Sequence, residues 1–230
     1  MLITWGAGLG LVGPFAIPLT ALTRREEFIT VPAAIIARFG MWLGGVKVTI
    51  HGRERINPDG VYVFTPNHQS LLDPPIVWVN VGTWYRRAGL LVKKEIKKVP
   101  VLGVGIDYVG MLAVDRSNPE AARESARRAS AAIKAGRSFF VFSEGTRTRD
   151  GHLLPFKKGA FYIAIDAGVP VVSVTIAGAF AAMPRGAIRL RPVPITVTFH
   201  EPIPTAGMTE ADVPALLERA RDAVASVLTL

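Results

Sequence analysis

Short apolar segments with strand character recur along the chain, and helical segments separate them. The strand segments are residues 46–50, 61–65, 138–142, 171–177 and 195–199. The first alternates apolar and polar residues, which is typical of a strand with one buried face, whereas the second is apolar almost throughout, which is typical of a strand buried on both faces. Strands that alternate with helices predict an α/β fold, here a mixed, largely parallel sheet flanked by helices.

Two helices have recognisable signals in the sequence. Residues 117–120, Ser-Asn-Pro-Glu, form a capping box with proline in the first turn, so we expect a helix to begin there. It should continue through an alanine-rich stretch to Ala135, with Gly136 as its terminator. A second helix near the end of the chain is predicted from apolar residues at helical spacing: Val213, Leu216, Leu217, Ala220, Val224 and Val227.

Residues 1–45 are set apart by their apolar composition. Residues 2–23 carry no charge, and about 20 apolar residues suffice to cross a bilayer, but glycines and prolines interrupt this stretch. It lacks the basic start of a signal peptide. A charged break at residues 24–27 precedes a second apolar stretch, in which Arg38 is the only charge. We predict two short apolar helices with a basic hinge, packed on one domain of residues 46–230. A membrane-dipping hairpin is the favoured interpretation, and two ordinary core helices are the alternative.

The charge of the chain favours an anionic partner. Lys and Arg number 27 against 18 Asp and Glu, so the net charge is +9, while 50% of the residues are hydrophobic. A basic and apolar chain is more typical of a protein on an anionic lipid surface than of one that binds nucleic acid, whose charge lies on a polar surface with stacking aromatics. The chain has no cysteine, which excludes disulfides, thiolate catalysis and cysteine-ligated metal sites.

Residues 67–73, Asn-His-Gln-Ser-Leu-Leu-Asp, follow the second strand segment and place His68 five positions before Asp73. Five residues of regular helix do not bring two side chains to one face, so the pair can meet only if His68 lies in a strand-to-helix turn and Asp73 in the first helical turn. A histidine oriented by a carboxylate is a typical general base. Because the chain offers no cysteine or G-x-S-x-G nucleophile, the hydroxyl to be activated is the substrate's own. A structural histidine is the alternative.

Two further segments carry groups suited to binding an anion. Residues 143–147, Ser-Glu-Gly-Thr-Arg, follow a strand, where ligands bind in α/β sheets, and Arg147 offers a planar fork for phosphate oxygens. The alternative is that residues 143–147 form a polar turn without a binding role. Lys93 begins a basic run, residues 93–98, that can equally be a solvated face, and Arg116 follows a strand at residues 110–114.

Taken in order, these segments resemble the glycerolipid acyltransferase family, whose archetype acylates 1-acylglycerol 3-phosphate. Four blocks carry the resemblance: residues 67–73, 93–116, 142–159 and 169–174. The resemblance covers about residues 45–200. Two positions depart from the family pattern: Ser143 stands where proline is common, and Leu71 where tryptophan is frequent. Neither departure removes a polar catalytic group, so they put substrate preference in question more than activity.

The resemblance implies transfer of an acyl group from an acyl thioester, either acyl-CoA or acyl-carrier protein, to the sn-2 hydroxyl of 1-acylglycerol 3-phosphate, giving phosphatidic acid. His68 and Asp73 are the implied catalytic residues, and no metal or bound cofactor is needed. The implied substrate-binding residues are Lys93, Arg116, Glu144, Gly145, Thr146 and Arg147. From the chemistry alone, Asn67 and backbone amides near Gly145 are candidate donors to the thioester oxyanion.

The implied substrates are lipids, so the site should open onto the cytoplasmic side of the cell membrane, with the protein held there as a peripheral or monotopic protein. An anionic membrane surface is the expected partner beside the lysophospholipid and the acyl donor, and no nucleic acid is expected. Another lysolipid acceptor, lyso-ornithine lipid or lysophosphatidylcholine, is the alternative substrate. A non-catalytic lipid-binding protein is a remote alternative, because His68, Asp73, Glu144 and Arg147 are all present.

Overall fold

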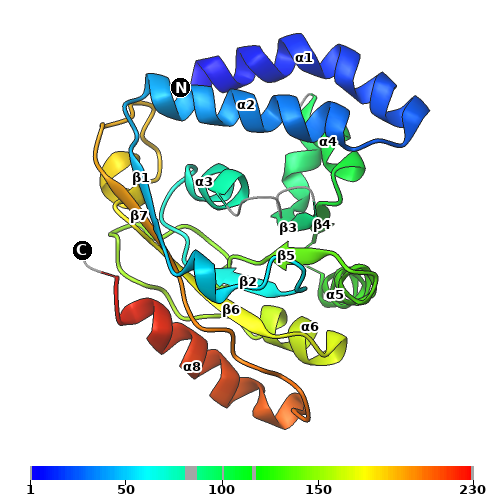
Figure 1. The fold of residues 1–230 in the computed structure, drawn as a ribbon, viewed down its shortest axis with the longest axis vertical. Helices are drawn as coiled ribbons and strands as arrows, with labels where there is room; N and C mark the ends of the chain where they lie inside the picture. Colours follow the sequence, from blue (N-terminus) through cyan, green and yellow to red (C-terminus); the bar gives the residue numbers. More distant parts are fainter. Residues whose placement is uncertain (1, 81–86, 100, 116–117, 229–230) are drawn as a thin grey trace.

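A computed structural model describes residues 2–80, 87–99, 101–115 and 118–228. Its centre is a seven-stranded sheet in the order β1-β7-β6-β2-β5-β3-β4, with helices on both faces (Figure 1). The predicted α/β class is therefore confirmed. The strands are β1 (Val48–His51), β2 (Val63–Pro66), β3 (Ala88–Lys93), β4 (Leu112–Val114), β5 (Ser138–Phe140), β6 (Val171–Ala177) and β7 (Ile195–Phe199).

The sheet is mixed but largely parallel, as the sequence predicts. The pairing between β6 and β7 is antiparallel, and the other pairings between neighbouring strands are parallel. Strands β6, β2 and β5 are neighbours in the middle of the sheet. Because they are parallel, the loops that follow them emerge at one edge of the sheet, which is the edge where ligands bind in α/β folds.

Each face of the sheet has its own apolar core, because successive side chains of a strand point to opposite faces. Phe64 and Phe140 pack on the side of α2 and α3, whereas Val63 and Phe139 pack on the side of α5, α6 and α8. Figure 1 shows these two helical layers above and below the sheet. The helices are α1 (Leu2–Thr23), α2 (Glu27–Leu43), α3 (Asp73–Asn80), α4 (Leu102–Tyr108), α5 (Pro119–Lys134), α6 (Gly159–Ala167), α7 (Ala179–Ala182) and α8 (Val213–Ala225).

Helix α5 begins one residue later than the predicted capping box indicates. The N-cap is Asn118, whose side-chain oxygen accepts hydrogen bonds from the backbone N–H groups of Glu120 and Ala121. Asparagine caps as well as serine does, and this register puts Pro119 at the first helical position, where its missing N–H has no consequence. Gly136 follows the helix with a positive φ of 95°, as expected of a terminator.

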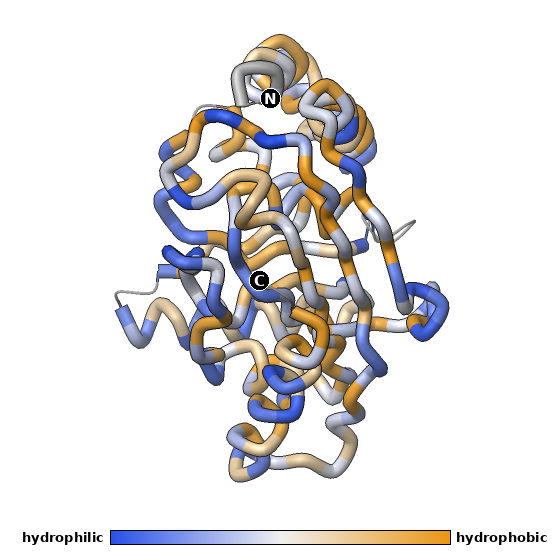
Figure 2. Tube along the Cα trace, turned by 90° about the vertical axis from the view of Figure 1, so that its left-hand side faces the viewer, coloured by the Kyte–Doolittle hydropathy of each residue, from blue (hydrophilic) through white to orange (hydrophobic). Residues whose placement is uncertain are grey.

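The N-terminal segment forms the two predicted helices, α1 and α2, which lie side by side (Figure 1). The first is longer than the predicted short helix: it covers 22 residues and contains Pro14 and Pro18. By length and composition, its residues Trp5–Thr23 could cross a membrane. The outer face of α1 exposes Leu11, Phe15 and Leu22, and Figure 2 shows the apolar colouring along this pair of helices.

Helix α2 belongs to the core as well as to the surface. Its residues Ala34, Ala37 and Met41 are buried in the apolar core that includes α3. The Arg38 guanidinium donates to the carbonyl oxygen of Val79 in α3 at 2.8 Å. One face of α2 therefore packs as an ordinary core helix does. Helix α1 covers α2 and presents apolar side chains to the outside.

Candidate active site

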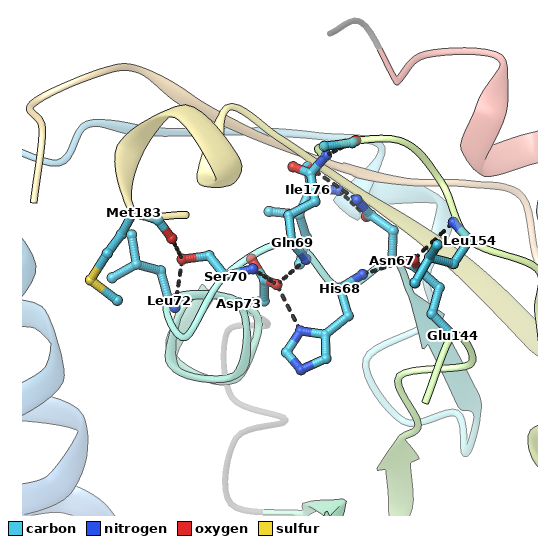
Figure 3. A network of polar contacts seen from close by, with 11 residues as sticks. Asn67, His68, Gln69, Ser70, Leu72, Asp73, Glu144, Leu154, Ile176 and Met183 are labelled. Carbon is cyan, nitrogen blue, oxygen red and sulfur yellow. Dashed lines mark hydrogen bonds and ion pairs between the residues drawn. The ribbon is translucent and has the colours of Figure 1, made fainter. Parts of the chain in front are cut away.

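His68 and Asp73 are in direct contact in the turn between β2 and α3. The His68 Nδ1 atom lies 2.8 Å from Asp73 Oδ2 (Figure 3). The strand ends at Pro66, and Asp73 is the first residue of α3. The bent strand-to-helix geometry that the five-residue spacing requires is therefore present.

The backbone of the turn holds the Asp73 carboxylate in place. Its Oδ2 also accepts hydrogen bonds from the backbone N–H groups of Gln69 and Ser70, each at 2.6 Å, and the side chain is fully buried. Its position in the first turn of α3 adds the favourable field of the helix N-terminus. A carboxylate held in this way has a fixed direction from which it meets the imidazole.

This contact determines which nitrogen of His68 can accept a proton. An ionised carboxylate only accepts hydrogen bonds, so Nδ1 carries the proton that it donates to Asp73. Nε2 is then the basic atom of the ring. The His68 side chain is 18% exposed, and its ring lies 4.3 Å from that of Phe142, centroid to centroid. The imidazole is thus packed on one side and accessible to a substrate.

Glu144 supports the same turn from the third block. Its Oε1 accepts the backbone N–H of His68 at 2.5 Å, and its Oε2 accepts that of Leu154 at 2.9 Å. Glu144 is 2% exposed as a whole residue, and burial raises its pKa to about 7, although the two hydrogen bonds act in the opposite direction. Glu144 therefore holds the backbone on which the base is mounted, and its predicted contact with the acceptor stays a prediction.

Asn67 does not fit the oxyanion role proposed for it from chemistry alone. Its amide donates to the Ile176 carbonyl oxygen at 3.0 Å and accepts from the Ile176 N–H at 2.7 Å, and the side chain is fully buried. This pair joins the end of β2 to β6. The N–H of Gly145 also has an acceptor, the Phe142 carbonyl oxygen at 3.0 Å. An oxyanion role for the other backbone amides near Gly145 stays a prediction.

Ser70 and Gln69 fix the turn to two distant segments. The Ser70 hydroxyl donates to the Met183 carbonyl oxygen at 2.7 Å, and the Gln69 amide donates to that of Gly151 at 3.0 Å. The Thr148 N–H donates to the His68 carbonyl oxygen at 3.0 Å. The segment around residues 148–151 is consequently positioned with respect to His68, and so is Met183 (Figure 3).

A pocket of about 470 Å³ adjoins this network. It is lined by Thr146, Arg147, Arg149, Asp150, Leu154 and Arg185. Two predicted substrate-binding residues, Thr146 and Arg147, thus line one pocket. The sequence analysis assigns no role to Arg149 or Arg185: Arg149 lies within the third block, residues 142–159, but is not among the implied substrate-binding residues, and Arg185 lies in none of the four blocks.

The other predicted phosphate-binding residues are placed differently. Lys93 ends β3, does not line this pocket, and lies 3.2 Å from Glu95 in an exposed ion pair. Arg116 falls outside the described residues. Within the basic run, Lys94 pairs with Asp115 at 2.6 Å on the surface, which agrees with the interpretation of this run as a solvated face.

Comparison with known proteins gives one consistent result. A family model described as Acyltransferase matches residues 47–177. A 1-acyl-sn-glycerol-3-phosphate acyltransferase of Cocos nucifera is 37% identical over 174 residues, 74% of this chain and 54% of that protein. The alpha form of that enzyme from Homo sapiens is 31% identical over 92% of this chain and 74% of its own.

A solved structure agrees with these relatives. The crystal structure of the 1-acyl-sn-glycerophosphate acyltransferase PlsC of Thermotoga maritima matches with a TM-score of 0.73 and 27% identity. That match covers 100% of this chain and 97% of the other. By contrast, the chain spans about half to three-fifths of the length of the plant relatives, 54% for Cocos nucifera and 61% for Limnanthes douglasii.

Proposed function

This chain belongs to the acyltransferase family that includes the 1-acyl-sn-glycerol-3-phosphate acyltransferases, and on that premise we propose that it acylates the sn-2 hydroxyl of 1-acylglycerol 3-phosphate. The donor is an acyl thioester, acyl-CoA or acyl-carrier protein, and the product is phosphatidic acid. The observation that carries the proposal is the 2.8 Å contact between His68 Nδ1 and the buried Asp73 carboxylate.

The reaction follows from that contact. Nε2 of His68 takes the proton of the acceptor hydroxyl while its oxygen attacks the thioester carbonyl. Asp73 stabilises the imidazolium that forms. When the tetrahedral intermediate collapses, the ester C–O bond is complete, the C–S bond breaks, and the proton passes from Nε2 to the departing thiolate. General base catalysis of this kind contributes about 10²–10⁴-fold in rate.

The remaining groups bind substrate in this proposal. Arg147 holds the acceptor phosphate through its planar guanidinium, and Thr146 lies beside it in the same pocket. Lys93, at the end of β3, is proposed to contact the acyl donor or the lipid, and the same role is proposed for Arg116, which falls outside the described residues. The chemistry uses a base and oxyanion donors, so we propose no cofactor.

We further propose that the pair α1–α2 holds the enzyme on the cytoplasmic surface of the cell membrane. The outward face of α1 exposes Leu11, Phe15 and Leu22, and that of α2 exposes Phe39 and Trp42. Burial of one large apolar side chain contributes about 1.5–3 kcal/mol. Basic residues add about 1 kcal/mol each near anionic lipid. Lipid substrates can then reach His68 without leaving the bilayer surface.

An acceptor-and-donor panel tests the proposal. The purified protein, in detergent or liposomes, is given labelled acyl-CoA or acyl-carrier protein together with 1-acylglycerol 3-phosphate, lysophosphatidylcholine or lyso-ornithine lipid. We expect phosphatidic acid to form fastest. Faster acylation of either of the other lysolipids would reassign the acceptor, and failure of every acceptor with both donors would remove the proposed activity.

A further inference from the structure

The pocket beside the catalytic turn is lined from two loops that follow parallel neighbours of β2. Residues 146–150 follow β5, and Arg185 follows β6 and the short helix α7. Strand β2, which leads to His68, lies between β5 and β6 in the sheet. The arginines of the two loops therefore flank the strand that delivers the base.

Three arginines and one aspartate line this pocket, so its net charge is +2. The Asp150 carboxylate is engaged within its own loop, where it accepts from the Thr148 hydroxyl at 2.9 Å and from the His152 N–H at 3.0 Å. In the described part of the chain, Arg147, Arg149 and Arg185 have no carboxylate partner, whereas Arg55, Arg127 and Arg137 each form an ion pair.

Three guanidinium groups around one pocket repel each other unless an anion lies between them. A phosphomonoester carries a charge of about −1.5 to −2 at neutral pH, which matches the pocket, whereas a phosphodiester carries about one negative charge. Planar guanidinium forks bind phosphate oxygens through paired hydrogen bonds.

The pocket is also fixed with respect to the base. Ser70 holds the loop of Arg185 through the Met183 carbonyl oxygen, 2.7 Å away. The N–H of Thr148, between Arg147 and Arg149, donates to the His68 carbonyl oxygen at 3.0 Å. A phosphate bound here would therefore be held at a set distance from the imidazole, which is what orientation of an acceptor hydroxyl requires.

We propose that Arg149 and Arg185, together with Arg147, bind a dianionic phosphomonoester, and that these two residues select acceptors with a phosphomonoester over lysolipids with a phosphodiester. This inference rests on the proposed acyl transfer and assigns its acceptor specificity. The phosphomonoester is that of 1-acylglycerol 3-phosphate. The 3′-phosphate of CoA has the same chemistry, and separate KM values for acceptor and donor distinguish the two sources.

The test compares Arg149→Gln, Arg185→Gln and the double variant with wild type. Arg189→Gln is the matched control, since Arg189 is exposed, lies in the same segment and does not line the pocket. Loss of a charge-assisted hydrogen bond should raise the KM for 1-acylglycerol 3-phosphate about tenfold or more in each single variant. The kcat and the donor KM should stay at wild-type values, and Arg185→Lys should restore part of the acceptor affinity. Activity on lysophosphatidylcholine should not fall.

Two results would overturn this assignment. The first is an acceptor KM in Arg149→Gln and Arg185→Gln that equals the acceptor KM of Arg189→Gln. The second is a rise in the donor KM alone, which would show that the pocket binds CoA. Calorimetric titration with glycerol 3-phosphate and with glycerophosphocholine gives a readout independent of turnover. We expect wild type to bind the first more tightly and the double variant to lose that preference. Equal binding of both compounds by wild type contradicts the inference even if acyl transfer is present.

Discussion

The backbone N–H of His68 donates to Glu144 Oε1 at 2.5 Å, so the base is held at its main chain by one carboxylate while Asp73 holds its ring. The other oxygen of Glu144 accepts the N–H of Leu154. One buried side chain thus joins the turn after β2 to the backbone of Leu154. Orientation of His68 relative to the acceptor depends on both attachments.

Replacement Glu144→Gln should lower kcat about tenfold with little change in either KM. The amide oxygen can accept from one of the two backbone N–H groups, and the other loses a charge-assisted partner, so the turn is held less rigidly. Steady-state kinetics with both substrates varied measure the effect, and Glu120→Gln on the exposed surface is the control. An unchanged kcat, or a change in the acceptor KM alone, would contradict this positioning role. A change in the acceptor KM alone would favour the predicted contact of Glu144 with the acceptor.

Glu144 should also make the folding stability fall as the pH rises. Burial raises its pKa from 4.5 to about 7 in the folded protein. Between these values the folded state keeps a proton that the unfolded state has released, so the contribution is fully present below the unfolded pKa and is lost as the pH rises through the folded pKa. The shift corresponds to about 3 kcal/mol.

The measurement is equilibrium unfolding of wild type and Glu144→Gln in the same detergent, from about pH 5 to about pH 8. All other titrating groups are common to both proteins, so the difference in unfolding free energy isolates Glu144. Glutamine does not titrate, so the unfolding free energy of the variant should increase relative to that of wild type as the pH rises. A difference that is constant with pH contradicts the raised pKa.

Replacement Asp73→Asn should lower kcat by about 10²–10⁴-fold. Its oxygen can still accept from the backbone of the turn, but a neutral amide no longer stabilises the imidazolium or fixes the tautomer of His68. Acyl transfer is measured beside circular dichroism and vesicle binding, which show whether the turn and the fold persist. If a folded Asp73→Asn protein transfers acyl groups at the wild-type rate, the carboxylate does not orient the base.

Membrane attachment is best tested by point substitutions on α1. Deletion of residues 1–42 should release the enzyme from membranes, but it also removes Ala34, Ala37 and Met41 from the core. The variant Leu11→Ser/Phe15→Ser/Leu22→Ser changes only exposed side chains. Each substitution removes about 1.5–3 kcal/mol of favourable free energy of burial in lipid. This variant should therefore sediment far less with anionic vesicles.

Val227→Ser is the matched control for the α1 substitutions. Val227 is exposed and follows α8, and that helix lies on the opposite side of the sheet from α1 and α2 (Figure 1). It should sediment like wild type, and both proteins should keep their activity on acceptors presented in detergent micelles. Equal sedimentation of the triple variant and wild type would show that another surface makes the attachment.

Local sequence signals predict much of this structure. The bounds of β6 and β7 agree with the predicted segments, because continuous or alternating apolar residues between turn residues leave few other registers. The contact between His68 and Asp73 is also local, since proline-bounded ends and a five-residue spacing allow one geometry.

Local sequence signals do not predict contacts between residues that are far apart in the chain. Asn67 finds its partner Ile176 109 residues away, so the sequence leaves its side chain apparently available for catalysis. Arg185 reaches the same pocket as Arg147 through the order of strands in the sheet, in which β5 and β6 are the two neighbours of β2. Only the fold reveals that these residues adjoin the catalytic turn.

The rate of acyl transfer by His68→Ala, measured against wild type on one preparation of 1-acylglycerol 3-phosphate and acyl-CoA, tests the central claim most directly. Loss of the base should lower kcat by about 10²–10⁴-fold. Vesicle binding and the circular dichroism spectrum should stay unchanged, because the hydrogen bond to Glu144 comes from the backbone of residue 68 and survives the substitution. A folded, membrane-bound His68→Ala protein that makes phosphatidic acid at the wild-type rate would contradict the account.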